Sequence, residues 1–130
     1  MTDLIEVHTA HLAGEPLAWA VGRAESLDVL LAPPIYGNPW RVFVRYTGEV
    51  TIREVRYDPQ ENWAVGGPLI DKHQAGLSHD WYLSGGPCGC SAGPINSTWL
   101  SGPTPLIAFC RALVHAKLGP IVRVPKELMP

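Results

Sequence analysis

The segment at residues 102–111 has the chemistry of an anion site at the start of a helix. Thr104 can cap the first turn with its hydroxyl, and Pro105 fits the first helical position because no N–H is needed there. Free backbone N–H groups and the helix dipole then favour a negatively charged ligand. Arg111 follows Thr104 by about two turns, so the two side chains would lie roughly in line. The same signals are typical of an ordinary capped core helix, and both interpretations stay open.

A second candidate site lies in the segment Trp63-Ala64-Val65-Gly66-Gly67-Pro68. The glycine pair would let the backbone approach a ligand closely, and Trp63 offers a flat face for stacking on a base. Trp99 could add a second aromatic face. The alternative is a tight turn in which Trp63 plugs the core, followed by a helical turn that begins at Pro68. The predicted ligand-binding residues are Trp63, Gly66, Gly67, Asp71, Trp99, Thr104 and Arg111.

Other residue combinations give weaker support for chemistry. His8 and His11 lack a third ligand at a recognised spacing, and Cys88-Gly89-Cys90 lacks a second cysteine pair, so neither a metal nor a cofactor is predicted. The chain has no nucleophile elbow of the Gly-x-Ser-x-Gly type. Cys110 is expected to face the core, where a thiol is a poor nucleophile. Enzyme activity is therefore not favoured, and a nucleotide hydrolase with Asp71 as base is the weaker alternative.

Composition limits the class of protein. The 130 residues fit one domain, and 46% hydrophobic against 17% charged residues argues against disorder. The formal net charge of -2 disfavours binding to duplex DNA, where affinity comes largely from Lys and Arg on phosphates. The three cysteines do not form a secreted disulfide framework, and no signal peptide or membrane-spanning run stands out. These features predict a protein of a reduced cytoplasm that does not contact a membrane.

Two main helices are expected to position the candidate residues. The first covers residues 14–25, where apolar side chains recur at helical spacing and Trp19 points away from them. The second covers residues 105–118, because Gly119 can take the left-handed cap and Pro120 blocks continuation. An exposed Trp19 on an apolar-rich chain would favour a symmetric homo-oligomer.

The remaining chain predicts short strands and long loops. Strands are expected at residues 4–9, 41–46, 49–57, 79–83 and 121–124. A two-residue turn at Thr47-Gly48 would place Arg41 opposite Glu54 as an ion pair worth roughly 0.2–1 kcal/mol. Residues 32–39 and 84–98 are rich in Gly and Pro and predict loops, the second of them flexible. The predicted fold class is α+β, a single small domain in which two main helices pack on one face of an antiparallel sheet.

Several segments also form a recognisable series of motifs. They are Tyr57-Asp58-Pro59, Trp63-Ala64-Val65-Gly66-Gly67-Pro68-Leu69-Ile70-Asp71, Gly102-Pro103-Thr104-Pro105-Leu106-Ile107-Ala108 and Lys117-Leu118-Gly119 followed by Val124-Pro125. In this order and spacing they resemble the NinX-like family of small phage and prophage proteins. The resemblance covers about residues 12–25 and 57–128. The chain departs from the family pattern at Asp71, where the family usually has Glu, and at residues 84–94, which resemble an insertion.

The resemblance implies a phage or prophage accessory protein that works in the cytoplasm of a bacterial host. Combined with the candidate site, it favours a non-enzymatic binder of a small anionic, nucleotide-like molecule, used to sequester a host defence signal. The alternative is a protein-interaction module that modulates a host or phage recombination or defence enzyme. That alternative is motivated by five Trp residues in a chain of low charge.

Overall fold

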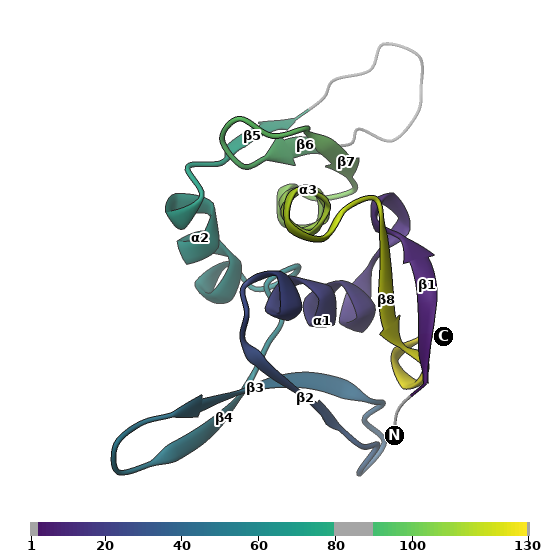
Figure 1. Ribbon diagram of the computed structural model, residues 1–130, viewed down its shortest axis with the longest axis vertical. Coiled ribbons are helices and arrows are strands. Elements are labelled where there is room, and N and C mark those ends of the chain that lie inside the picture. Colours follow the sequence, from purple (N-terminus) through teal and green to yellow (C-terminus); the bar gives the residue numbers. More distant parts are fainter. Residues whose placement is uncertain (1–2, 80–89, 130) are drawn as a thin grey trace.

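The computed structural model describes residues 3–79 and 90–129, and these ranges form three α-helices and eight strands (Figure 1). The helices are α1 (Gly14–Ala24), α2 (Trp63–Lys72) and α3 (Pro105–Leu118), with 3-10 turns η1 (Thr9–His11) and η2 (Lys126–Leu128). The strands are β1 (Leu4–His8), β2 (Asp28–Ala32), β3 (Arg41–Thr47), β4 (Ile52–Arg56), β5 (Gly76–His79), β6 (Cys90–Gly93), β7 (Leu100–Gly102) and β8 (Ile121–Pro125). The predicted α+β class and the single domain are confirmed.

The described strands form three antiparallel sheets, not one. β1 pairs with β8, β2–β3–β4 form a second sheet, and β5–β6–β7 form a third. Figure 1 views α3 nearly end-on, with the β5–β7 sheet above it, α1 and the β2–β4 sheet below it, and the β1–β8 pair to one side. The expected single sheet is divided because the strands cover α1 and α3 from several sides.

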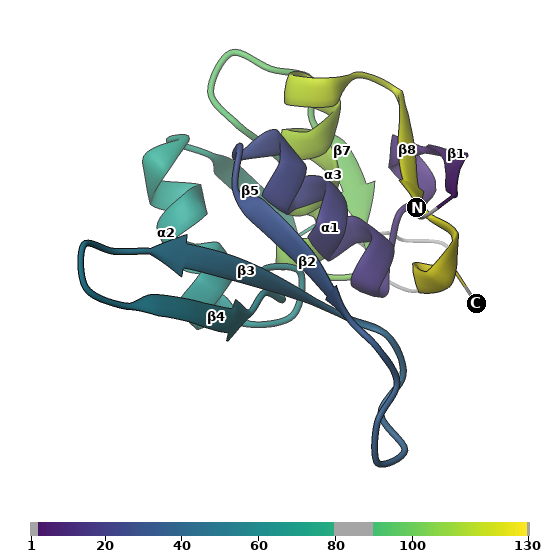
Figure 2. The same cartoon turned by 60° about the horizontal axis from the view of Figure 1, so that its bottom comes forward.

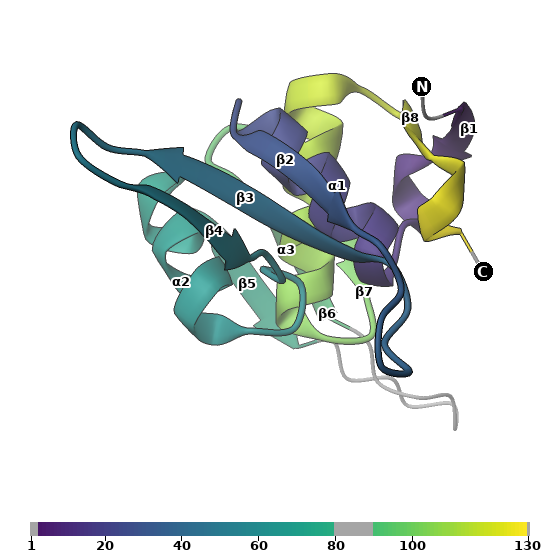
Figure 3. The same ribbon diagram turned by 90° about the horizontal axis from the view of Figure 1, so that it is seen from below.

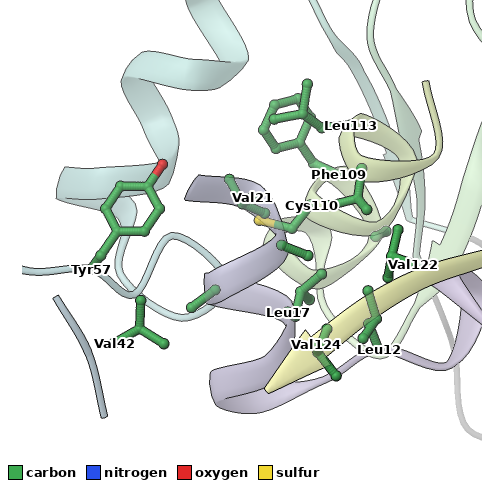
Figure 4. Packing of buried hydrophobic residues seen from close by; sticks show 14 of the residues in the cluster. Leu12, Leu17, Val21, Val42, Tyr57, Phe109, Cys110, Leu113, Val122 and Val124 are labelled. Carbon is green, nitrogen blue, oxygen red and sulfur yellow. The ribbon is translucent and has the colours of Figure 1, made fainter. Parts of the chain in front are cut away.

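Helix α3 is the centre of the core because it is apolar on nearly every side. Its buried residues are Leu106, Ala108, Phe109, Cys110, Ala112, Leu113 and Val114. Figure 4 shows Phe109 and Cys110 in one cluster with Val21 of α1 and Val124 of β8. The predicted end signals are confirmed. Thr104 Oγ1 accepts a hydrogen bond from Ile107 N at 3.2 Å, and Gly119 follows the helix with a φ of 96°.

Helix α1 packs between α3 and the β2–β4 sheet, as Figures 2 and 3 show from two sides. Val42 and Val44 of β3 are fully buried on the helix-facing side of the sheet. Glu15, in the first turn of α1, fastens the sheet to the helix. Its carboxylate accepts from the Val42 N–H at 2.8 Å and from the Arg56 guanidinium at 2.7 Å. Both ends of the predicted first helix are confirmed to within about one residue.

The register predicted for the β3–β4 hairpin was wrong. Residues 48–51 form a four-residue loop, closed by a hydrogen bond from Gly48 N to Thr51 O at 2.8 Å, in place of a turn at residues 47–48. Glu54 therefore pairs with Arg45 at 3.0 Å, and not with Arg41. The shift along β3 is an even number of residues, so each side chain keeps its predicted face of the sheet.

Helix α2 replaces the tight turn that was predicted at residues 63–68. Asn62 caps the helix by accepting a hydrogen bond from Ala64 N at 3.0 Å, so the helix begins at Trp63 and not at Pro68. Pro68 lies inside the helix, where it lacks the N–H for one internal hydrogen bond. The prediction missed the capping residue, which outweighed the helix-breaking signals of the glycine pair and the proline.

The segment before α3 also differs from its prediction. Strand β6 lies within residues 84–98, so the loop prediction was wrong for Cys90–Gly93. The strand is supported because Gly76 of β5 and Gly93 of β6 pair with each other, and the Trp99 ring covers both. Residues 80–89 are outside the described residues, including most of the strand predicted at 79–83. His79 is the last residue of β5.

The cap on α3 gives a direct test of this central helix. Thr104→Ala removes the hydroxyl that accepts from Ile107 N, and should lower the free energy of unfolding by about 1 kcal/mol. Thr104→Ser keeps the hydroxyl and should change it by much less. Urea denaturation of the two variants is the measurement. Equal losses in both would show that the hydroxyl does not cap the helix.

Candidate ligand-binding site

The two long sequence motifs meet in space through Gly66. A Cβ atom added at Gly66 would lie 2.5 Å from the Pro59 carbonyl oxygen and 2.8 Å from Leu106 Cδ2. Leu106 belongs to the first turn of α3, so the absence of a side chain lets α2 approach this end of the central helix. Gly67, by contrast, has no atom within 4 Å of such a Cβ. The contact between the motifs is therefore apolar packing.

At the start of α3 the predicted ligand donors have partners within the protein. The Thr104 hydroxyl accepts from Ile107 N, and Pro105 has no N–H to offer. The Arg111 guanidinium donates from Nε to Leu12 O at 2.7 Å and from Nη1 to Ser101 O at 3.0 Å. Burial lowers the pKa of this guanidinium from its ordinary value. Arg111 thus ties α3 to two neighbouring backbone segments.

The other predicted residues lie on two different elements. Trp63 begins α2 with 55% of its surface exposed, and Asp71 is exposed near the end of the same helix. Trp99 packs over the β5–β6 strands and stays 46% exposed. None of the seven predicted residues lines either of the two pockets considered next, each of which takes Lys72 as part of its wall.

A basic pocket of about 620 Å³ lies at the C-terminal ends of α2 and α3. It is lined by Lys72, His73, Gln74, Pro94, Ile95, Asn96, Ser97, Thr98, His115, Ala116 and Lys117. These residues include two lysines and two histidines, and no carboxylate. Basic side chains at this end of a helix also complement the partial negative charge of its dipole. The pocket nevertheless gathers cationic and hydrogen-bonding groups around one space.

Two residues of the basic pocket have left-handed backbone conformations. Gln74 has a φ of 48° and Asn96 a φ of 58°, which residues with side chains adopt at a cost. The loop that holds Asn96 is fastened to α2, because Ile95 N donates to His73 O at 3.1 Å. The Ser97 hydroxyl donates to Pro94 O at 2.7 Å within the same loop. Gln74 takes this conformation where α2 ends, since Ala75 N donates to Ile70 O at 3.0 Å as in an ordinary helix C-cap, and asparagine adopts it more readily than most residues.

Glu25 does not line the basic pocket, but it holds two of the residues that do. It follows the last turn of α1, and its carboxylate is bonded to Lys72 Nζ at 2.8 Å and to His73 Nε2 at 2.9 Å. Only 5% of the Glu25 side chain is exposed. Burial raises the pKa of this carboxyl, but the hydrogen bonds and charges of Lys72 and His73 outweigh burial and hold the pKa below its ordinary value. The ionised carboxylate therefore fixes the last turn of α2 against α1.

No separate signal in the sequence pointed to this pocket. Of its basic residues, only Lys117 lies within a motif quoted above, and none of them was assigned to a site. Basic residues lie in the last turns of α2 and α3, and they mark the helix ends at which the pocket lies. Their convergence depends on the packing of α2 beside α3, which Gly66 permits and which the sequence does not reveal.

The histidine and cysteine residues considered for metal binding or nucleophilic chemistry lie partly within the described residues. Within residues 3–79 and 90–129, no group of three His, Cys, Asp or Glu side chains could hold a metal ion. The His8 and His11 rings contact each other edge-on, with centroids 5.7 Å apart. Cys110 is fully buried as predicted, and burial raises the pKa of its thiol. Cys88 lies outside the described residues.

The fold and these pockets define a small single-domain α+β protein whose central helix is wrapped by small antiparallel sheets. The family described as Bacteriophage P22, NinX matches the chain over residues 8–117, which is most of its length. The chain belongs to the NinX family, as its motifs indicated, and this membership is consistent with a phage accessory protein. A search of curated proteins finds no match. Among the described residues, no helix has the length and apolarity to cross a bilayer.

The glycine pair of α2 provides a matched test of the contact between the motifs. Gly66→Ala should destabilise the protein by about 1–3 kcal/mol, because its Cβ would overlap the Pro59 carbonyl and Leu106. Gly67→Ala meets no atom beyond its chain neighbours, and its helix-favouring methyl is opposed by the following Pro68, which restricts the residue before it, so it should change stability by less than about 1 kcal/mol. Thermal and urea unfolding of both variants compares the two changes. A loss in Gly67→Ala as large as that in Gly66→Ala would contradict the close approach at Gly66.

Glu25 should make stability depend on pH in the acidic range. Because its pKa is lowered on folding from 4.5, its interactions contribute fully above that value and are lost as pH falls through the folded pKa. Glu25→Gln should therefore cost about 1 kcal/mol at pH 7, a value kept modest by the exposed Lys72, and less at pH 3. Glu54→Gln, in the exposed pair with Arg45, should cost under about 0.5 kcal/mol. Identical pH dependence in both variants would exclude this role for Glu25.

Proposed function

We propose that this phage accessory protein binds a small anionic, nucleotide-like ligand in the host cytoplasm and sequesters it without turnover. The observation that carries the proposal is the basic pocket between the ends of α2 and α3 and the loop at residues 94–98. Its volume of about 620 Å³ falls in the range of small-molecule sites. Side-chain ammonium and imidazole groups would bind the anion there, with hydroxyl and amide groups of the loop alongside.

Lys117 is the main anion-binding group in this proposal. Lys72 and His73 are already engaged by Glu25, whereas none of the ion pairs among the described residues involves Lys117. An ammonium on a flexible stem can reach a phosphate as a point charge. His115, two residues earlier on α3, lines the same pocket. A host signal of this chemistry could be removed from solution by stoichiometric binding alone.

The start of α3 remains the competing location for the anion. It was predicted from Thr104 and Arg111, with Trp63, Gly66, Gly67, Asp71 and Trp99 as the associated residues. Arg111 would have to exchange its backbone acceptors for the ligand. Variants at Lys117 and Thr104 therefore distinguish the two locations.

Calorimetry against ADP-ribose and cyclic dinucleotides tests the proposal. At least one of these probes should bind the wild-type protein, and Lys117→Ala should weaken its binding by about tenfold, because a charged hydrogen bond is lost. Lys126→Ala removes an exposed lysine outside the pocket and should change affinity by less than about twofold. Chromatography of the released probe should recover it unchanged.

Three results would contradict the proposal. Absence of binding by every probe at millimolar concentration would favour the alternative of a protein-interaction module. Loss of binding in Thr104→Ala but not in Lys117→Ala would move the ligand to the start of α3. Conversion of the probe would replace sequestration by hydrolysis.

A further inference from the structure

We infer that a second pocket, lined in part by Tyr57, holds the uncharged ring of the ligand, a planar heterocycle that carries a carbonyl beside an N–H. The pocket has a volume of about 430 Å³ and lies between α2, the β3–β4 hairpin and the end of α1. The inference names the ring of the ligand proposed above and so rests on the proposed function. Lys72 connects the two, because it lines both this ring pocket and the basic pocket.

The first observation is a buried hydroxyl without a partner. Tyr57 is only 5% exposed, and its hydroxyl oxygen has no hydrogen-bond partner among the described residues. Buried polar side-chain atoms in proteins are mostly hydrogen-bonded, so such a group calls for an explanation. In Figure 4 the hydroxyl lies beside the pale teal helix α2, which forms one wall of the ring pocket. Because the oxygen is closed off from solvent, a bound carbonyl would satisfy this hydroxyl once the pocket wall moves aside.

The walls of the ring pocket suit a flat apolar ring. Helix α2 contributes Val65, Pro68 and Leu69, which lie on one face of the helix. The Tyr46 ring forms the opposite side at the hairpin, and the Arg53 guanidinium lies over it at 6.0 Å from the centroid. A ligand ring inserted beside Tyr46 would exchange water for an aromatic face.

The polar groups of the ring pocket determine which edge of a ligand ring can form hydrogen bonds there. Burial, and then the charge of Glu25, raise the pKa of Tyr57, so its hydroxyl stays protonated and can donate to a carbonyl. Glu25 lines the same pocket with an ionised carboxylate, whose oxygens can each accept more than one hydrogen bond. It can therefore accept from a ring N–H. A donor beside an acceptor selects the lactam edge of uracil or guanine, and the carboxylate disfavours a phosphate in this pocket.

Uncharged nucleosides test the ring pocket apart from the basic pocket. Uridine and guanosine should bind the wild-type protein more tightly than 3-methyluridine and adenosine, by about tenfold, as followed by NMR titration. Tyr57→Phe should remove this preference, while its melting temperature stays equal to the wild type or rises, because an unpartnered buried hydroxyl is removed. Tyr36→Phe removes an exposed tyrosine hydroxyl outside the ring pocket and should change affinity by less than about twofold.

The comparison of methylated and unmethylated rings needs no variant, so it holds even if Tyr57→Phe folds poorly. Equal binding of uridine and 3-methyluridine, or full binding by a folded Tyr57→Phe, would overturn the inference. Failure of all four nucleosides, with Lys117-dependent binding of ADP-ribose or a cyclic dinucleotide retained, would overturn the ring pocket alone. Nucleoside binding with the lactam preference, without any anion binding at Lys117, would support the ring pocket and overturn the basic pocket.

Discussion

The burial of helix α3 is the constraint on which the rest of the structure depends. A helix that is apolar on nearly every side needs cover all round, and this chain supplies it from small elements. Helix α1 and the β5–β7 sheet cover two sides, and β8 and η1 add contacts. Close approach requires small residues, and Gly102 faces Ala108 as Gly66 faces Leu106. The pockets arise at the edges of this cover, where small elements leave space between them.

Glu25 lies between two different environments on the surface, the basic pocket and the ring pocket. The carboxylate engages Lys72 and His73, so that Lys117 is the lysine of the basic pocket without an ion pair among the described residues. Glu25 also lines the ring pocket together with Tyr57 and Tyr46. A nucleotide also has two environments, a charged phosphate and an uncharged ring. The basic pocket would suit the phosphate and the ring pocket the uncharged ring, and this match is the physical basis of the proposed ligand class.

Local signals in the sequence were sufficient to predict the ends of helices and the faces of strands that depend on nearby residues alone. The ends of α3 follow from Thr104, Pro105 and Gly119, and the faces of the β3–β4 hairpin follow from alternation alone. The exact register of this hairpin could not be predicted, because the length of the loop at residues 48–51 is set by its own hydrogen bond. Helix α2 depended on the Asn62 cap, and strand β6 on the distant Trp99 ring. Tyr57 and Lys117 lay within recognised motifs, but their convergence with Glu25 is tertiary and was not predictable.

The central claim is that the two sides of the last turn of α2 bind one ligand of nucleotide type. The most direct measurement is a titration of the 15N-labelled protein with uridine 5′-monophosphate, which carries both a lactam ring and a phosphate, followed by backbone amide shifts. We expect the amides of His73, Asn96 and Lys117 to shift together with those of Tyr57 and Val65, in one saturable process. Shifts confined to residues around Thr104, or no saturable shifts at all, would contradict the claim.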